Sequence, residues 1–376
     1  MITKQGEILM SIPFVDLKAQ YQSLKSEIDK AIQDVIQDTA FVGGKYVKKF
    51  EEEFADYCNT KYCVGVGNGT DAITIALKSI GIGAGDEVIT AANSFIATSE
   101  AITVTNAKVV FVDCHPDYYT IDISKIEEKI TNKTKAIIPV HLYGQPADMG
   151  HILEIAKKYN LYVIEDAAQS HGAKYNNQKV GTFGDIGCFS FYPGKNLGAY
   201  GDAGAIVTDN EELSVKCRML ANHGRVEKYN HEFEGYNSRL DGLQAAILSV
   251  KLKYLDEWNA KRRAVAKDYN ESLKKTDIIT PKELSGAQCV YHLYVIRAKK
   301  RDELQAFLKK RGISTGIHYP IGLPYLKAYN YLNHTPEDFP ITYKYQNKLL
   351  SLPMYPELST HHIDYIIKTT KKALNT

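Results

Sequence analysis

The sequence predicts an α/β protein with a mostly parallel sheet, followed by a smaller α+β domain. Short apolar runs alternate with amphipathic stretches, such as residues 71–80 and 150–159, through the first two-thirds of the chain. This alternation is typical of a parallel sheet that is covered by helices on both faces. The seven expected strands are residues 62–66, 87–91, 108–112, 136–141, 161–165, 187–191 and 205–208.

A change in the pattern of apolar and charged residues late in the chain indicates a second domain. A long helical pattern over residues 240–255 continues into the charged residues 257–275. An apolar run over residues 289–298 then precedes a helix-like segment, a second short strand and a C-terminal helix from about Thr360. We therefore expect a large domain over residues 12–257 and a small domain over residues 258–376.

Composition argues against several classes of protein. The 376 residues are 44% hydrophobic and 24% charged, with a net charge of +2, so there is no electrostatic footprint for nucleic acid or a membrane surface. No apolar run approaches the roughly 20 residues of a membrane span. The N-terminus lacks the apolar centre of a signal peptide, and Met10 is a second candidate start. We expect a cytoplasmic protein that binds neither nucleic acid nor membrane.

The six cysteines predict neither disulfides nor a metal site. They are scattered, and no pair has the C-x-x-C spacing of a zinc site. We expect reduced thiols and no bound metal.

Two segments carry residues suited to a covalent cofactor. Lys195 lies among glycines directly after the strand expected at residues 187–191, and Asp166 follows another expected strand. A lysine amine can form a Schiff base with an aldehyde, and a carboxylate can hold a pyridinium nitrogen protonated. The pair predicts pyridoxal phosphate bound covalently to Lys195, which would also move protons during catalysis. Asp166 could instead cap the next turn. Glu165 is the alternative partner for the ring nitrogen, but the alternation of side chains along a strand points Glu165 to the opposite face.

A glycine-containing turn offers a place for the cofactor's phosphate. In Gly67-Asn-Gly-Thr-Asp71, Gly69 and Thr70 lie where a strand meets a helix. A helix N-terminus presents unpaired amides and a favourable dipole to an anion. In isolation, a plain turn with a Thr or Asp cap would explain this motif equally well.

Three blocks together, residues 67–72, 165–172 and 190–205, carry a family resemblance. From about Ile12 to the C-terminus the chain resembles the DegT/DnrJ/EryC1/StrS family of pyridoxal-phosphate-dependent nucleotide-sugar aminotransferases. The resemblance implies the type I, aspartate aminotransferase-like fold. It also implies a homodimer with shared active sites, and pyridoxamine phosphate as the intermediate form of the cofactor.

The resemblance also assigns roles to single residues. Asp166 matches the partner of the ring nitrogen, and Phe95 the ring over the pyridine face, although a core aromatic is the alternative for Phe95. His171 is expected to pack or hydrogen-bond locally. The other implied contacts are Gln169 near the phenolic oxygen, Ser190 at the phosphate, Asn237 reaching the phosphate of the other subunit, and His318 and Tyr319 facing the substrate. After Pro320 the chain departs from the family pattern, with Gly322 and Pro324 where the family commonly has proline and histidine.

The tract at residues 191–202 resembles the branch that aminates C3 of dTDP-3-keto-6-deoxyhexoses. The expected reaction transfers the amino group of L-glutamate to that ketone, in the biosynthesis of a dTDP-3-amino-3,6-dideoxyhexose. Amination at C4 of a nucleotide-linked sugar, or of a keto-inositol, would use the same residues. A dehydratase is disfavoured, because such relatives have histidine in place of the lysine. A non-catalytic regulatory protein that binds the cofactor is the alternative from another class.

Overall fold

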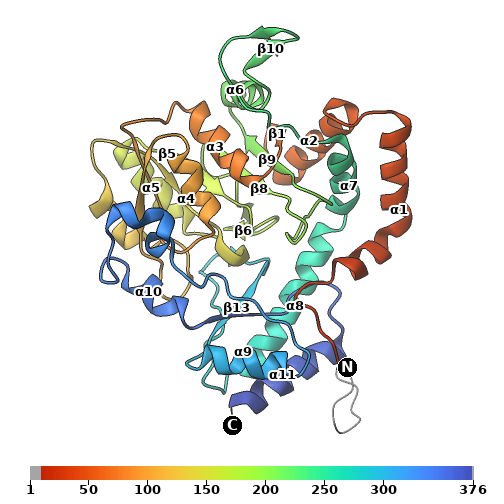
Figure 1. Ribbon diagram of the computed structural model, residues 1–376, viewed down its shortest axis with the longest axis vertical. Helices are drawn as coiled ribbons and strands as arrows, with labels where there is room; N and C mark the ends of the chain where they lie inside the picture. The colour runs from red at the N-terminus through yellow and green to blue at the C-terminus, as the bar shows by residue number, and fades with distance from the viewer. Residues whose placement is uncertain (1–9, 375–376) are drawn as a thin grey trace.

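A seven-stranded sheet organises the larger part of this computed structural model, which describes residues 10–374 (Figure 1). The strand order is β1-β9-β8-β5-β4-β2-β3. Strand β9 runs antiparallel to its neighbours β1 and β8, and the other neighbouring strands are parallel, so the predicted fold class is confirmed. The strands are β1 (Tyr62–Val66), β2 (Glu87–Ala91), β3 (Lys108–Val112), β4 (Thr134–Ile138), β5 (Tyr162–Asp166), β8 (Ile186–Ser190) and β9 (Gly204–Thr208).

Some strand ends differ from the sequence prediction. Strand β4 ends at Ile138 rather than at residue 141, because Pro139 has no N–H to continue the ladder. Strand β5 extends one residue further than expected, so Asp166 is its last residue and not the first one after it. The expectation that the N-terminus is not a signal peptide, and the choice between Met1 and Met10 as the start, concern residues 1–9, which lie outside the described range.

Helices cover both faces of the sheet. Helices α3 (Gly69–Ser79), α4 (Ile96–Thr103) and α6 (Glu211–Ala221) pack on one face, to which Ile206 of β9 points. Helices α2 (Gly44–Cys58), α5 (Met149–Tyr159) and α7 (Gly242–Leu252) cover the other face, to which the adjacent Val207 points. Helix α1 (Leu17–Gln37) packs outside this layer, against α7. The sheet is thus buried on both faces, as continuous apolar strands require.

The long helical pattern after residue 240 forms two helices. Helix α7 ends at Leu252, and α8 (Leu255–Leu273) begins after a short break at Lys253 and Tyr254. The prediction of one continuous pattern is wrong here, because the two helices have different partners. Helix α7 is buried against α1 and α2. The first turn of α8 still joins these clusters, through Leu255 and Trp258, whereas the rest of α8 packs against the C-terminal helix of the second part. None of the helices within residues 10–374 is long and apolar enough to cross a membrane.

The second part of the structure surrounds a two-stranded antiparallel sheet of β13 (Tyr294–Arg297) and β14 (Leu349–Leu352). Helices α8, α9 (Arg301–Lys309) and α11 (Thr360–Leu374) pack around it (Figure 1). Ile12, near the start of the described chain, pairs with Ile313 and is buried in this same cluster. The division at residues 257 and 258 stays a prediction.

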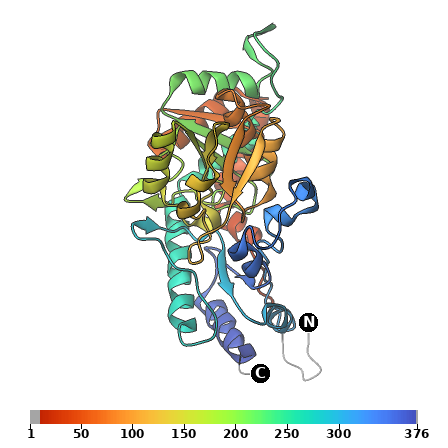
Figure 2. The same ribbon diagram turned by 90° about the vertical axis from the view of Figure 1, so that its left-hand side faces the viewer.

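Two small strand pairings lie outside these sheets. Strands β12 (Ala287–Gln288), β6 (Lys174–Tyr175) and β7 (Gln178–Lys179) form a three-stranded sheet. Strands β10 (Arg225–Glu227) and β11 (Asn230–His231) form a hairpin that projects beyond α6, at the top of Figures 1 and 2. Tyr229, at the hairpin tip, is 84% exposed, so this hairpin makes little contact with its own chain.

Residues 322–346, the docking segment, leave the second part and pack on the large sheet (Figures 1 and 2). The segment contains two 3-10 turns and the short helix α10 (Pro340–Gln346). Leu323, Tyr329 and Phe339 are buried in the same apolar cluster as α3 and α4. The Tyr329 hydroxyl also donates to Ser99 Oγ of α4 at 2.7 Å. The docking segment therefore belongs to the core of the large sheet, although it lies late in the sequence.

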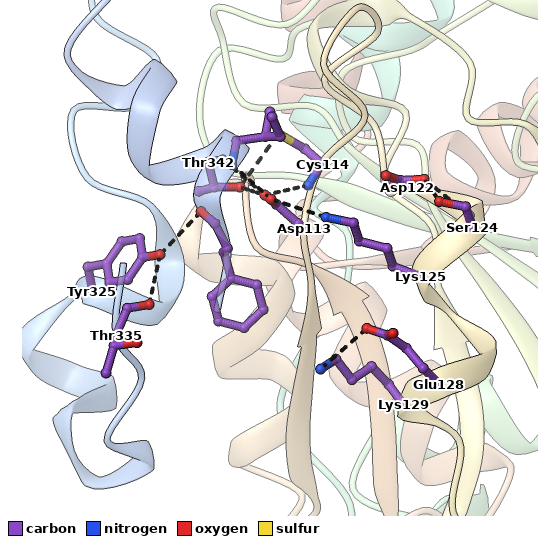
Figure 3. A network of polar contacts seen from close by, with 12 residues as sticks. Asp113, Cys114, Asp122, Ser124, Lys125, Glu128, Lys129, Tyr325, Thr335 and Thr342 are labelled. Carbon is purple, nitrogen blue, oxygen red and sulfur yellow. Dashed lines mark hydrogen bonds and ion pairs between the residues drawn. The ribbon is translucent and has the colours of Figure 1, made fainter. Parts of the chain in front are cut away.

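A buried carboxylate fixes the far end of the docking segment (Figure 3). The side chain of Asp113, directly after β3, accepts hydrogen bonds from the backbone N–H groups of Ile341 and Thr342, both at 2.9 Å. It also accepts one from the Thr342 hydroxyl at 2.6 Å, and Lys125 Nζ lies 3.8 Å away. Asp113 thus caps the first turn of α10 and offsets the helix N-terminal charge.

Replacing Asp113 by Ala should lower the free energy of unfolding by roughly 2–4 kcal/mol, because three buried donors lose a charged acceptor. Urea-induced unfolding followed by far-ultraviolet circular dichroism measures the change. Glu128→Ala is the matched control, since Glu128 is 61% exposed and its only ion pair within residues 10–374 is with its neighbour Lys129. Equal effects of the two substitutions would contradict a stabilising role for the Asp113 cap.

Candidate active site

A cavity of about 760 Å³ lies where the carboxyl ends of the parallel strands meet the second part of the structure. This edge of an open α/β sheet is where ligands usually bind. Nearly all the residues selected from the sequence line the cavity: Gly69, Thr70, Phe95, Asp166, Gln169, Ser190, Lys195, His318 and Tyr319. Asn237 does not line it.

Two adjacent carboxylates at the end of β5 point in opposite directions. Glu165 is fully buried, and its carboxylate accepts from the backbone N–H groups of Gly181, Phe183 and Gly184 at 2.6–2.8 Å. His141 Nε2 lies 2.9 Å from the same carboxylate. Because side chains alternate along a strand, Glu165 points away from the cavity and has a structural role, whereas the Asp166 carboxylate faces the cavity.

Asp166 is held by a residue that the sequence analysis missed. Thr98 Oγ1 donates to Asp166 Oδ2 at 2.7 Å, and the N–H of Ala168 donates to Oδ1 at 3.2 Å. Phe95 is the N-cap of α4, and Thr98 lies three residues later in the first turn of the helix, so both residues line the cavity. The spacing was the available signal. The two hydrogen bonds fix the orientation of the carboxylate, so that it faces the cavity and can balance a positive charge there.

Lys195 presents its amine to the same cavity from a loop after β8. The loop is closed by hydrogen bonds from the Lys195 N–H to Tyr192 O and from the Ala199 N–H to Phe191 O, both at 2.8 Å. Burial lowers the pKa of Lys195 to about 8, although the negative charge of Asp166 opposes this shift. About a tenth of the amine is therefore neutral and nucleophilic at pH 7, far more than for a lysine with its ordinary pKa.

The N-terminus of α3 forms a cradle for an anion. Asn68 Oδ1 accepts from the N–H of Asp71 at 2.9 Å, while the N–H groups of Gly69 and Thr70 have no acceptor within residues 10–374. A Cβ at Gly69 would lie 2.5 Å from Ser190 Cβ, so only glycine allows this close approach. Backbone amides and the hydroxyls of Thr70 and Ser190 thus converge where a phosphate could bind.

Aromatic and amide groups form one wall of the cavity. The Phe95 and Tyr319 rings are 5.7 Å apart at an angle of 38°. Phe95 is 52% exposed, which excludes the alternative that it is a core aromatic. Gln169 is held at both ends, since its Oε1 accepts from the N–H of Tyr143 at 2.7 Å and its Nε2 donates to the Tyr319 hydroxyl at 3.0 Å. Its amide therefore has a fixed position beside Tyr319.

His318 is held in the cavity wall by two contacts. The His318 ring stacks on Phe14 at 5.6 Å, and its Nδ1 lies 2.8 Å from Ser351 Oγ. Burial lowers the pKa of His318 to about 4, so the ring is neutral at pH 7.

At Gly322 the sequence departs from the family pattern, and the structure explains why a proline does not stand there. Gly322 donates its N–H to Gln346 Oε1 at 2.9 Å, which a proline could not do.

His171 packs locally, as expected. It is fully buried, and its ring lies 5.4 Å from that of Phe189 and 5.6 Å from that of Phe191. Burial lowers its pKa to about 3, so His171 is a neutral packing residue.

Asn237 is exposed, on the chain between the β10–β11 hairpin and α7. Its backbone pairs with Asn222. The N-cap of α7 is Asp241, so Asn237 does not cap this helix. Asn237 does not contribute to the cavity of its own chain.

A buried amine, a carboxylate and an anion cradle in one cavity form a donor set that fits pyridoxal phosphate. Together they define a pyridoxal-phosphate-dependent aminotransferase. Comparison with known proteins supports this class and narrows it. The model of the DegT/DnrJ/EryC1/StrS aminotransferase family matches residues 22–371, and the chain belongs to this family.

Individual relatives agree over nearly the whole chain. A pleiotropic regulatory protein of Geobacillus stearothermophilus is 49% identical, over 96% of this chain and 97% of its own. A dTDP-3-amino-3,6-dideoxy-alpha-D-galactopyranose transaminase of Aneurinibacillus thermoaerophilus is 46% identical, over 96% of this chain and 99% of its own. The crystal structure of DesV from S. venezuelae, in complex with a ketimine intermediate, superimposes with a TM-score of 0.96. DesV is 42% identical, over 97% of this chain and 99% of its own.

Asp166→Asn should preserve the fold and reduce turnover by at least ~10²–10³-fold, the effect of losing one major electrostatic contact in other active sites. The amide of asparagine can still accept the hydrogen bond from Thr98, but it carries no charge to balance a positive charge in the cavity. Steady-state transamination with glutamate measures the loss, and thermal unfolding checks the fold. Asp302→Asn, at an 82%-exposed position on α9, is the control. Near-normal turnover of the Asp166 variant would assign the charge to another group.

Proposed function

We propose that this aminotransferase transfers the amino group of L-glutamate to the C3 keto group of a dTDP-3-keto-6-deoxyhexose. The product would be a dTDP-3-amino-3,6-dideoxyhexose. The observation that carries the proposal is the Lys195–Asp166 pair in the cavity of a chain that is 46% identical to a transaminase named for a dTDP-3-amino sugar. A cytoplasmic location stays a prediction from the sequence.

Lys195 and Asp166 have the catalytic roles in this proposal. Bound pyridoxal phosphate supplies a ring that accepts electrons from the substrate carbon. Lys195 holds the cofactor covalently, and when its amine is displaced it moves a proton to and from that carbon. The pKa of about 8 suits this role, because the amine can both give and take a proton near neutral pH. Asp166 keeps the ring nitrogen positively charged.

The remaining residues position the cofactor and the sugar. Gly69, Thr70 and Ser190 bind the phosphate through the cradle at α3. Phe95 would cover one face of the bound ring, and Gln169 would lie beside its phenolic oxygen. His318 and Tyr319 face the substrate. Two observations support these roles: the residues line one cavity, and hydrogen bonds fix the side chains of Gln169 and His318.

We also propose a homodimer in which Asn237 completes the phosphate site of the other subunit. Asn237 is exposed and lies outside its own cavity, and the projecting hairpin before it makes little contact with its own chain. Both features are expected of a segment that contacts a second subunit.

A regulatory function is the competitor from another class, because the Geobacillus relative is named a pleiotropic regulatory protein. The intact amine–carboxylate pair favours catalysis, since a passive cofactor-binding protein has no need of a proton-transferring amine. Amination at C4 of the sugar, or amination of a keto-inositol, would use the same residues. Identifying the product distinguishes these reactions from amination at C3.

Product analysis tests the proposed function. The holoenzyme is incubated with glutamate and, separately, with dTDP-4-keto-6-deoxyglucose or its 3-keto isomers. The expected outcome is consumption of glutamate with a 3-keto isomer only, and an amino group at C3 by nuclear magnetic resonance. An amino group at C4 would establish the alternative position. Cofactor binding without turnover of any keto sugar or keto-inositol would favour the regulatory function.

The dimer proposal predicts that two inactive chains restore activity when mixed. In a heterodimer of Lys195→Ala with a disruptive Asn237→Asp chain, one site carries both defects and the other carries neither. Random exchange should recover about a quarter of wild-type activity, because half of the dimers are mixed and each has one intact site of two. Mass spectrometry of isotope-labelled chains confirms exchange. No recovery despite exchange would place Asn237 outside the site.

A further inference from the structure

His292 lines the cavity but has no role in the functions described so far. It lies just before β13, and it shares the cavity with Lys195 and His318. Its Nδ1 lies 3.2 Å from Oδ1 of Asn196, the residue that follows Lys195. The other ring nitrogen, Nε2, bonds to no group among residues 10–374 and is not sealed from solvent, so it opens to the cavity.

The orientation of the Asn196 amide is fixed by its partners. Asn196 is 2% exposed, and its Nδ2 donates to Asn259 Oδ1 at 2.8 Å and to the carbonyl of Val290 at 3.1 Å. Asn259 cannot be turned around, because its own Nδ2 donates to the carbonyl of His171 at 2.8 Å. Both hydrogens of the Asn196 amide are therefore used, and only its oxygen faces His292.

This arrangement selects one form of the imidazole. An amide oxygen can only accept, so Nδ1 of His292 must carry the hydrogen. Burial lowers the pKa of His292 well below its ordinary value, and the positive charges of Lys195 and Arg262 lower it further. The ring is thus neutral at pH 7, and its Nε2 carries a lone pair that points into the cavity.

We propose that Nε2 of His292 accepts a hydrogen bond from a hydroxyl group of the keto sugar, and that Asn196 is the positioning residue that maintains this acceptor. The inference rests on the proposed sugar aminotransferase function. Carboxylates and phosphates offer only acceptors at pH 7 and cannot bond to this nitrogen. A keto sugar offers hydroxyl donors on its ring. The amino group of glutamate reacts at the cofactor, and its other polar groups are carboxylates. His292 would therefore distinguish the sugar from glutamate, which reacts in the same cavity.

Two substitutions separate the acceptor from the contact with Asn196. His292→Asn keeps an amide donor near Asn196 but has nothing at the position of Nε2, whereas His292→Gln places an amide oxygen close to that position. The two half-reactions are followed separately in the holoenzyme, by cofactor absorbance, with glutamate and with a dTDP-3-keto-6-deoxyhexose. His292→Asn should leave the glutamate half-reaction within about threefold of wild type. It should slow the sugar half-reaction about 10–100-fold, and His292→Gln should recover part of this loss.

Deoxy analogues of the sugar identify the hydroxyl. In wild type, one single-deoxy analogue should react as slowly as the intact sugar does with His292→Asn, and the variant should not discriminate between them. His151→Asn, on the exposed surface of α5, is the control substitution and should change neither half-reaction. Equal losses in both half-reactions, or equal losses for His292→Asn and His292→Gln, would overturn the proposal.

The form of the ring is measured without any substrate. Nitrogen-15 chemical shifts of histidine in the holoenzyme distinguish Nδ1–H from Nε2–H. We expect neutral His292 with hydrogen on Nδ1, and loss of this single form in Asn196→Ala. A cationic ring, or hydrogen on Nε2, overturns the proposal even if sugars are aminated. Failure of the proposed function would appear differently, as wild-type enzyme that reacts with glutamate but with no keto sugar.

Discussion

The alternation of two carboxylates at the end of β5 is the constraint on which the site depends. Glu165 is fully buried and is satisfied by three backbone N–H groups and His141. These hydrogen bonds satisfy the buried carboxylate and fix the loop that surrounds it. Because Glu165 holds its place so firmly, the register of β5 cannot slip, and Asp166 must face the opposite side. The position of the catalytic charge is thus set by its neighbour.

A second consequence concerns the charge balance of the cavity. Lys195 loses solvation in the cavity, and the negative charge of Asp166 compensates only in part, so the pKa of the amine falls to about 8. Burial lowers the pKa values of His318 and His292, and the nearby positive charge of Lys195 lowers them further. Because both imidazoles are neutral, Lys195 is the only cationic side chain among the described residues that line the cavity. A phosphate at α3 would be held by dipoles and hydroxyls rather than by a second buried cation.

Much of the fold could be predicted from the sequence because buried parallel strands are continuous apolar runs. The elements that carry Asp166 and Lys195 were found in this way, with strand ends in error by a few residues at most. The break between α7 and α8 was missed, because it reflects different packing partners and not a local breaker such as proline. The contacts of Phe14 with His318 and of Asn196 with His292 join segments far apart in the chain. No local pattern encodes them, and only the folded structure brings these residues together.

The docking segment has a consequence for protein engineering. Its apolar side chains Leu323, Tyr329 and Phe339 complete the core beside α3 and α4, while the cavity residues His318 and Tyr319 come just before it in sequence. A chimaera that joined the sheet of this protein to the C-terminal residues of a relative would therefore exchange part of its own core. Altering sugar preference by swapping terminal halves would require the core beside α4 to be repacked at the same time. Point substitutions on the cavity wall avoid this coupling.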